Sequence, residues 1–392
     1  MTSKELMNLD QSCVMQTYGR FPVAIDHGHG ATLVSPEGKE YIDFASGIGV
    51  NCLGYGNEKW LEAVTAQAGK LAHVSNLYYS EPYILLAQQL TSRTGMKRAF
   101  FANGGGEANE GMIKLCRKYS YDKYGTGRST IITLRDSFHG RTITTLKATG
   151  QDVFHQYFFP FTEGFQYAIS NDLQSVRDLD DGTVCAVMVE LVQGEGGVLP
   201  LSQEFVTGLS QLCKEKDWLL AVDEVQTGVG RTGSLFCFQQ YGILPDVMSF
   251  AKGIGGGLPL AGILASEKTA GVFTPGTHAT TFGGNPVCCA GGLAVLEQLT
   301  DEVLESVKEK GAYLKAQIEK IPQVASVRGM GLMLGVSLKD GIDYSTKIKA
   351  MLEEGLMCLT AGHGTIRLLP PLTISKEEMD KGTEIMAKVL GE

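Results

Sequence analysis

The sequence of 392 residues has no apolar stretch long enough to cross a bilayer and no run of lysine and arginine. A membrane-spanning helix needs about 20 successive apolar residues, so we expect no membrane partner. The formal net charge of −9, without a basic cluster, argues against a nucleic-acid partner. Anionic ligands must therefore be held by a few individually placed arginines. No N-terminal stretch resembles a secretory signal.

Paired-cysteine motifs, fixed-period repeats and low-complexity segments are also missing. The nine cysteines are scattered without Cys-x-x-Cys spacing. We expect reduced, mostly buried thiols, as in a cytoplasmic protein. His27 and His29 flank a glycine, but no third ligand is evident, so we predict no metal site. Glycine is abundant instead, with 49 residues, which is nearly twice the average usage of about 7%.

Strand and helix patterns alternate through the middle of the chain. Apolar strand patterns occur at 97–102, 130–134, 184–189, 218–222, 247–251 and 260–265, with helical patterns such as 107–123 and 202–217 between them. This alternation predicts an α/β fold with a mostly parallel sheet covered by helices on both faces.

We predict three segments along the chain. Residues 1–55, with strand patterns at 22–25, 31–34 and 41–44, form an N-terminal meander that belongs to the small domain. Residues 56–286 form the large domain. Residues 287–392 form a C-terminal small α/β domain, in which a helical pattern runs to about 320 with an interruption near Thr300.

A single lysine stands at the end of one predicted buried strand. The apolar residues 247–251 lead into Lys252, and a glycine-rich loop follows at 253–257. Burial lowers the pKa of a lysine, and a neutral amine can condense with a carbonyl group. A solvated lysine before a flexible turn is the alternative, and this stretch alone does not decide between the two.

Polar or glycine clusters directly follow five of the predicted strands. In open α/β sheets the ligand crevice lies beyond the carboxyl ends of the strands. Glycines 104–106 also precede a helix, which is an outline of a phosphate site, although the P-loop and dinucleotide motifs are absent. The clusters are Gly104–Gly106, Phe138–Arg141, Glu195, Asp223–Gln226 and Lys252.

Pyridoxal 5′-phosphate would use an amine, a carboxylate and a phosphate cradle placed together in this way. Its aldehyde bonds to a lysine, its pyridine nitrogen pairs with a carboxylate, and its phosphate needs N–H donors. Asp223 suits the pyridine nitrogen. Phe138 could stack on the ring and Gln226 could bond the ring hydroxyl, although a core aromatic is the simpler interpretation of Phe138.

Seven motifs together resemble the class III, fold-type I aminotransferases, which implies a large domain with a mostly parallel seven-stranded sheet. The resemblance covers almost the whole chain. The motifs are 100–103 with 107–110, 138–142, 190–197, 223–233, 251–253, 281–286 and 366–367. One position departs from the family: a serine usually stands where this chain has Gly104, so a hydroxyl near the phosphate is lost.

The resemblance implies cofactor roles for individual residues. Lys252 would bond the cofactor aldehyde and carry a proton, while Asp223 would pair with the pyridine nitrogen. Gly105 and Gly106 would donate N–H groups to the phosphate. The remaining implied cofactor residues are Phe138, Glu224, Val225, Gln226 and Thr281, the last of these serving the partner subunit of a homodimer with shared active sites.

Substrate roles follow from the same resemblance. Arg141 and Thr280 would bind the substrate, with Arg141 holding the α-carboxylate of the amino donor. Arg367 would hold a carboxylate of 2-oxoglutarate, and Glu195 would pair with Arg367 while the donor is bound. Leaving a buried arginine unpaired costs free energy. It is therefore physically reasonable that Glu195 stays paired with Arg367 until a dicarboxylate substrate replaces it.

The 75–79 stretch and the compact length resemble the members that use N2-acetylornithine, as in arginine biosynthesis. The products would be N-acetyl-L-glutamate 5-semialdehyde and L-glutamate. Succinylornithine, N-succinyl-diaminopimelate, ornithine and 4-aminobutyrate stay open as alternative donors. A non-catalytic cofactor-binding relative, or mutase or decarboxylase chemistry on the same cofactor, also stays open.

Overall fold

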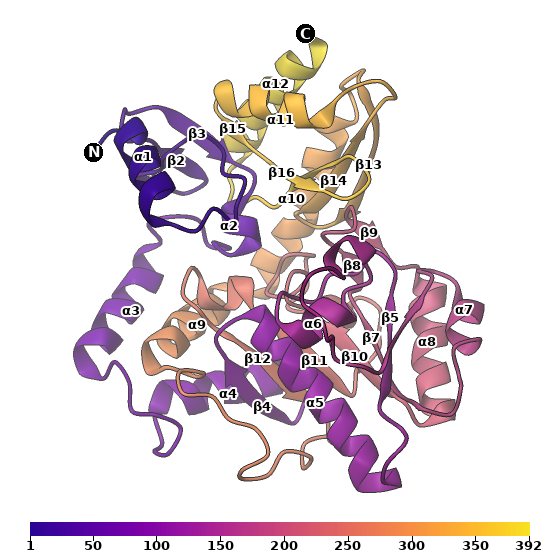
Figure 1. The fold of residues 1–392 in the computed structure, drawn as a ribbon. Helices are drawn as coiled ribbons and strands as arrows, with labels where there is room; N and C mark the ends of the chain where they lie inside the picture. Colours follow the sequence, from indigo (N-terminus) through magenta and orange to yellow (C-terminus); the bar gives the residue numbers. More distant parts are fainter.

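The structure is a computed structural model that describes residues 1–392. Its central element is a seven-stranded sheet of order β4-β12-β11-β10-β7-β5-β6 (Figure 1). The strands are β4 (Arg98–Ala102), β5 (Thr130–Leu134), β6 (Phe165–Ala168), β7 (Val184–Val189), β10 (Leu219–Asp223), β11 (Val247–Phe250) and β12 (Ala261–Ala265). The predicted α/β fold is therefore confirmed.

One strand, β12, runs antiparallel to both of its neighbours. Only residues 251–260 connect β11 to β12. A parallel return needs a crossover of a dozen or more residues, so this short connection dictates the antiparallel pairing. The other neighbouring strands pair in parallel, as expected for most of the sheet.

Both faces of the central sheet are buried, and successive residues face opposite sides. Ala221 of β10 packs in the core under α5 (Gly105–Tyr124), whereas Leu220 and Val222 lie in the core that also contains Phe205 of α8 (Gln203–Lys216). This explains why the strands are continuous apolar runs rather than alternating patterns.

A second part of the molecule stands above the central sheet in Figure 1. One four-stranded sheet, β13-β14-β17-β16, packs with C-terminal helices. Another, β1-β2-β3-β15, joins the two ends of the chain through the parallel pair of β3 and β15. The strands are β1 (His27–His29), β2 (Thr32–Val34), β3 (Glu40–Asp43), β13 (Val324–Met330), β14 (Met333–Leu338), β15 (Leu356–Met357), β16 (Leu359–Ala361) and β17 (Thr365–Leu368).

The predicted strand at 22–25 is wrong, and the meander begins at β1 instead. Residues 22–25 pair with no other strand, so no ladder forms there. The interruption near Thr300 is confirmed: its side chain accepts the N–H of Val303 and caps α10 (Asp301–Ile318). The C-terminal helices α11 (Tyr344–Glu353) and α12 (Lys376–Gly391) complete this part.

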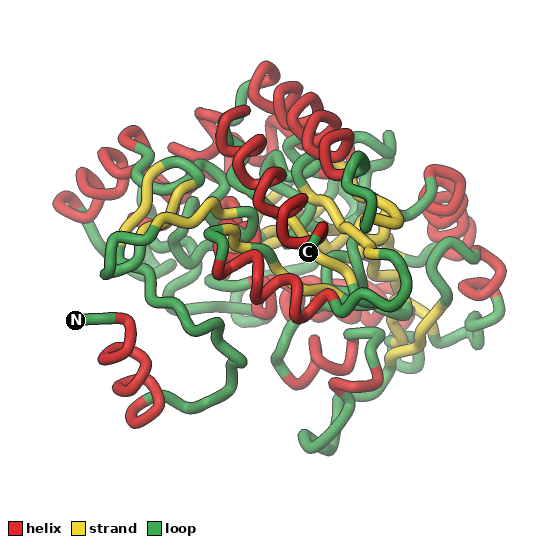
Figure 2. The backbone as a smooth tube through the Cα atoms, turned by 90° about the horizontal axis from the view of Figure 1, so that it is seen from above, coloured by secondary structure: helices red, strands yellow, loops and turns green.

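The helix α9 (Pro286–Gln298) packs against α3 (Glu58–Lys70) and α4 (Glu81–Thr94), beside the central sheet. The prediction places most of α9 in the C-terminal domain, and the domain boundaries at 55/56 and 286/287 stay predictions. At the N-terminus, α1 (Ser3–Cys13) buries no residue and lies at the periphery of the view in Figure 2.

Several short elements escaped the sequence patterns. They are α2 (Ser46–Gly49), α6 (Ile143–Ala148), α7 (Leu173–Arg177), β8 (Val192–Gln193) and β9 (Leu199–Pro200), as well as β6. Each spans too few residues for periodicity to be read. Among all helices of the structure, none combines the length and the apolar character that a bilayer crossing requires.

Candidate active site

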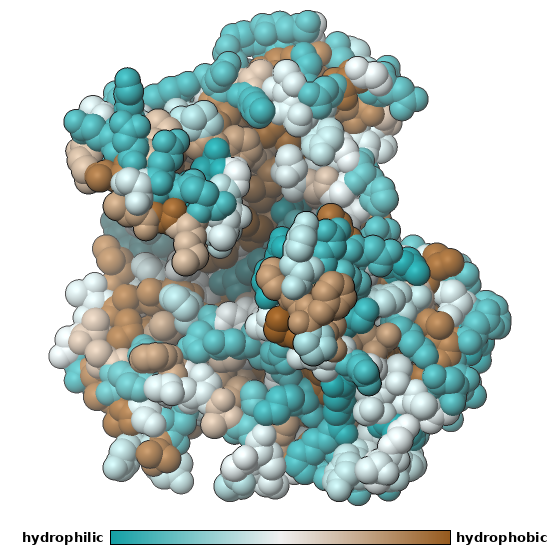
Figure 3. All heavy atoms as spheres, viewed as in Figure 1, coloured by the Kyte–Doolittle hydropathy of each residue, from teal (hydrophilic) through white to brown (hydrophobic).

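A cavity of about 710 Å³ opens beyond the carboxyl ends of β4, β5, β7, β10 and β11. The space-filling view shows the molecule hollowed between its upper and lower parts (Figure 3). The cavity brings together predicted site residues from segments far apart in the sequence. Those that line it are Gly105, Gly106, Phe138, Arg141, Glu195, Asp223, Val225, Gln226 and Lys252.

Lys252 reaches the cavity from the first position of the short turn after β11. Its φ of 51° is unusual for a residue with a side chain, and such backbone conformations are concentrated at functional sites. Burial and the positive charge of Arg367 lower the pKa of Lys252 to about 8, against the opposing effect of Glu195 and other carboxylates. A substantial fraction of this amine is therefore neutral near physiological pH.

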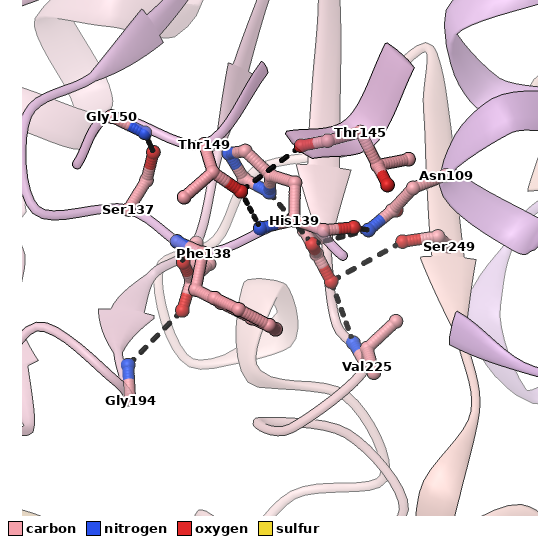
Figure 4. A network of polar contacts seen from close by, with 12 residues as sticks. Asn109, Ser137, Phe138, His139, Thr145, Thr149, Gly150, Gly194, Val225 and Ser249 are labelled. Atoms are coloured by element: carbon pink, nitrogen blue, oxygen red, sulfur yellow. Dashed lines mark hydrogen bonds and ion pairs between the residues drawn. The ribbon is translucent and has the colours of Figure 1, made fainter. Parts of the chain in front are cut away.

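Asp223, the last residue of β10, is buried and accepts hydrogen bonds on both carboxylate oxygens (Figure 4). Oδ2 accepts from Nδ1 of His139 at 2.8 Å and from Nδ2 of Asn109 at 2.7 Å. Oδ1 accepts from the backbone N–H of Val225 at 3.0 Å. These three donors fix the orientation of the buried Asp223 carboxylate.

His139 and Asn109 form a second layer behind Asp223. Nδ2 of Asn109 also donates to the backbone carbonyl of His139 at 2.7 Å, which ties the two residues together. Nε2 of His139 and Oδ1 of Asn109 are buried without hydrogen-bond partners. Both residues lie within the sequence motifs, but no role was predicted for them. Each acts through a hydrogen bond to Asp223, which lies 84 residues from His139 and 114 residues from Asn109.

The N-terminus of α5 faces the same cavity with free donors. The backbone N–H groups of Gly105, Gly106 and Glu107 donate to no atom of the protein. A Cβ on Gly105 would lie 2.8 Å from Cγ1 of Val225, whereas a Cβ on Gly104 would meet nothing within 4 Å. Together with the helix dipole, these donors form an anion cradle.

Glu190 follows β7 and was another residue without a predicted role. Its carboxylate is buried and accepts the backbone N–H of Phe138 at 2.6 Å and that of Gly194 at 3.0 Å (Figure 4). Burial raises the pKa of Glu190 to about 7, although His139 and these two N–H groups oppose the shift. No sequence pattern distinguished it from a structural strand-end carboxylate.

Arg367 on β17 lies behind the cavity and is paired. Nη1 of Arg367 contacts Oε1 of Glu195 at 2.6 Å and Oε1 of Gln226 at 3.2 Å. The Arg367 side chain is 3% exposed and that of Glu195 is 30% exposed, so the carboxylate is the more solvated partner. The predicted pairing of Glu195 with Arg367 thus corresponds to a contact in the structure.

Arg141 presents a guanidinium without an ion-pair or hydrogen-bond partner in the protein. Its Cζ lies 4.2 Å from the ring centre of Phe154 and 5.4 Å from that of Phe138. The two rings contact each other edge-on, with centres 6.0 Å apart. The cation is therefore held by aromatic faces, while its N–H donors stay free for a carboxylate.

Besides Arg367, three predicted site residues lie outside the cavity lining. Glu224 is buried, accepting from Thr227 Oγ1 at 2.5 Å and from the backbone N–H of Phe238 at 2.7 Å, and burial raises its pKa to about 7. Oγ1 of Thr280 accepts from Nδ2 of Asn103 at 3.3 Å. Thr281 is exposed to solvent.

Comparison with known proteins decides the family. The pattern described as "Aminotransferase class-III" matches residues 13–390. The chain belongs to the class III aminotransferases. It is therefore an enzyme with the fold-type I architecture, and its cofactor is pyridoxal 5′-phosphate.

Individual relatives agree with this placement. Over the full length of both chains, it is 48% identical to an acetylornithine aminotransferase of Haemophilus ducreyi. A succinylornithine transaminase of Citrobacter koseri is 43% identical, covering 95% of this chain and 94% of the relative. The crystal structure of the ornithine aminotransferase from Toxoplasma gondii superposes with a TM-score of 0.94 at 29% identity, covering 100% of this chain and 95% of that one.

The residues of the cavity fit the cofactor. Free N–H groups at the start of α5 suit its phosphate, and the buried carboxylate of Asp223 suits a pyridinium nitrogen. The lowered pKa of Lys252 suits attack on an aldehyde. When bound, pyridoxal phosphate supplies an aldehyde that accepts an amine and a ring that withdraws electrons from the neighbouring carbon.

Replacing Gly104 with serine is expected to strengthen cofactor retention. The site is open to a Cβ, and a hydroxyl there adds a donor next to the free N–H groups of α5. Gly104→Ala is the matched control, since it restricts the backbone equally without the hydroxyl. The measurement is the dissociation constant of pyridoxal phosphate by equilibrium dialysis. Equal constants for the serine and alanine variants would contradict the role of the hydroxyl.

Cofactor binding by the apoprotein is expected to accelerate as the pH rises through about 8. The neutral fraction of Lys252 increases there, whereas an ordinary lysine would need a pH of about 10.4. Stopped-flow absorbance of apoprotein mixed with pyridoxal phosphate would measure the rate across this range. A rate that keeps rising to the pKa of a free lysine would show that the site does not lower the pKa.

Proposed function

We propose that the enzyme transfers the distal amine of N2-acetyl-L-ornithine to 2-oxoglutarate, giving N-acetyl-L-glutamate 5-semialdehyde and L-glutamate in arginine biosynthesis. The acetylornithine aminotransferase names of several relatives with 43–48% identity support this donor. The observation that carries the proposal is the Glu195–Arg367 pair at 2.6 Å, close to Lys252.

That pair suits a site with two different substrates. A monocarboxylate donor leaves Arg367 with Glu195, whereas the second carboxylate of 2-oxoglutarate displaces Glu195 and binds Arg367. Removing one partner from a buried ion pair costs about 3–5 kcal/mol, so Arg367 must be paired throughout. Glu195 is the partner that can leave, because it is the more exposed of the two.

The remaining roles follow from position. Arg141, with free N–H donors at the cavity, binds the carboxylate of the donor. Asp223 would hold a proton on the pyridine nitrogen, and Phe138 would stack on the ring. Lys252 Nζ would take up the proton from the substrate carbon that bears the distal amine and release it again. The N–H groups of Gly105 and Gly106 would hold the phosphate, and Gln226, which also lines the cavity, would bond the ring oxygen.

Succinylornithine is the second candidate donor, because a succinylornithine transaminase is 43% identical over 383 residues. Both donors carry the same α-carboxylate and distal amine and differ only in the acyl group. None of the roles given above to cavity residues involves the acyl group. Discrimination between the two donors therefore depends on the outer part of the cavity.

A donor panel tests this proposal. Purified holoenzyme with 2-oxoglutarate is given acetylornithine, succinylornithine, ornithine or 4-aminobutyrate, and glutamate formation is measured for each. We expect the highest kcat/KM for acetylornithine, because relatives at 44–48% identity bear the name acetylornithine aminotransferase. A higher kcat/KM for ornithine or 4-aminobutyrate would refute the assignment.

A homodimer with shared active sites is the assembly we propose. Apolar side chains stand exposed around the loop that contains Thr281: Leu77 is 85%, Tyr79 96% and Phe282 62% exposed. Asn76 joins the two segments, since its Nδ2 donates to the carbonyl of Gly283 at 2.9 Å. Such a patch is typical of a protein–protein contact. At this surface, Thr281 would donate a hydrogen bond to the phosphate of the cofactor bound in the partner subunit.

Mixing two inactive variants tests the shared site. Lys252→Ala removes the amine from its own site, and Thr281→Val weakens the phosphate contact across the interface. If both residues serve one site from different chains, subunits exchanged between the variants form one site lacking both residues and one intact site. Activity regained on mixing is the expected result, and light scattering should give about twice 42.2 kDa. A monomeric mass would contradict the proposal.

We place the enzyme in the cytoplasm. All nine cysteines are free, and seven of them are buried. Adjacent Cys288 and Cys289 remain thiols in a half-buried to buried helix. Free thiols in this number are typical of proteins kept in a reducing compartment.

A further inference from the structure

Glu190 connects two loops that approach the cavity from different strands. Its Oε1 accepts the N–H of Phe138, in the loop after β5, at 2.6 Å. Its Oε2 accepts the N–H of Gly194, beyond β8, at 3.0 Å. Both oxygens are thus used, and the side chain is buried. Glu190 therefore joins these two loops close to the cavity, in addition to the bond from Nε2 of Gln193 to the backbone carbonyl of Arg135 at 2.7 Å.

Each loop carries one end of the substrate site. Phe138 precedes by three residues Arg141, whose guanidinium is free at the cavity. Gly194 directly precedes Glu195, which is paired with Arg367 at 2.6 Å. A change in the separation of the loops would therefore change the geometry between the two arginine sites.

The Gly194 side of this connection has little freedom. A Cβ at Gly194 would overlap the side-chain amide of Gln226, so the backbone lies directly against that group. Oε1 of Gln226 in turn lies 3.2 Å from Nη1 of Arg367. Displacement of Gly194 would therefore disturb both groups that hold Arg367, Glu195 through the chain and Gln226 through contact.

From this geometry we propose that Glu190 is a positioning residue that sets the separation between Arg141 and Arg367 and so selects the length of the dicarboxylate substrate. The proposal rests on the proposed function, in which both arginines bind substrate carboxylates. A dicarboxylate that spans both sites depends on their separation, whereas a monocarboxylate bound at Arg141 does not.

Glu190→Gln tests the connection in the holoenzyme. The amide keeps the length of the side chain but has only one acceptor oxygen, so its NH2 group faces one of the two backbone N–H donors. One of the two bonds between Glu190 and the loops is then lost. Glu190→Asp is the second variant, because it keeps the charge but is one methylene too short to reach both donors. Glu204→Gln, on the exposed side of α8, is the matched control.

The readout is binding of two unreactive probes by calorimetry: glutarate, a five-carbon dicarboxylate, and pentanoate, its monocarboxylate counterpart. We expect Glu190→Gln and Glu190→Asp to weaken glutarate binding about tenfold and pentanoate binding less than about twofold, with Glu204→Gln unchanged. The KM for 2-oxoglutarate should rise in parallel, while the KM for the amino donor and kcat change little.

Unchanged glutarate affinity in both variants would overturn the spacing role and leave the proposed function intact. Equal weakening of glutarate and pentanoate would also overturn it, since that pattern indicates general loosening of the site. Wild-type enzyme that binds glutarate no more tightly than pentanoate would instead refute the two-arginine site of the proposed function.

Discussion

The chemistry of this enzyme depends on keeping one amine out of water. Lys252 stands at the end of a buried strand, and burial together with the nearby Arg367 lowers its pKa to about 8. The short connection between β11 and β12 makes this arrangement possible, because it turns the chain back within residues 251–260 and leaves the amine at the sheet edge. The strained φ of Lys252 is part of the same turn.

The surrounding charges are arranged so that none of the buried ones lacks compensation. Asp223 is buried but accepts from three side-chain or backbone N–H groups, and Arg367 is buried but paired with Glu195. Burying a charge without such partners costs several kcal/mol. Arg141 is exposed at the open cavity, where water solvates its charge. It therefore needs no partner from the protein before a substrate carboxylate binds.

Sequence reasoning identified the residues that touch the cavity better than those that hold them in place. Lys252, Asp223 and the glycines at the start of α5 each end a strand or begin a helix, which is a local pattern. His139, Asn109 and Glu190 act through hydrogen bonds to groups distant in the sequence, and no spacing rule reveals such bonds. The wrong strand at 22–25 had a similar origin, since a strand needs a partner as well as a pattern.

The sequence by itself determined the α/β class, most helices and strands, and the edge of the sheet at which the site lies. These properties follow from apolar periodicity and from the rule that strand ends carry the ligand crevice. Only the tertiary structure decided that β12 runs antiparallel, that His139 and Asn109 bond Asp223, and that Glu190 joins two loops. Each of these is a contact between remote segments, whose energy depends on distance and burial rather than on local sequence.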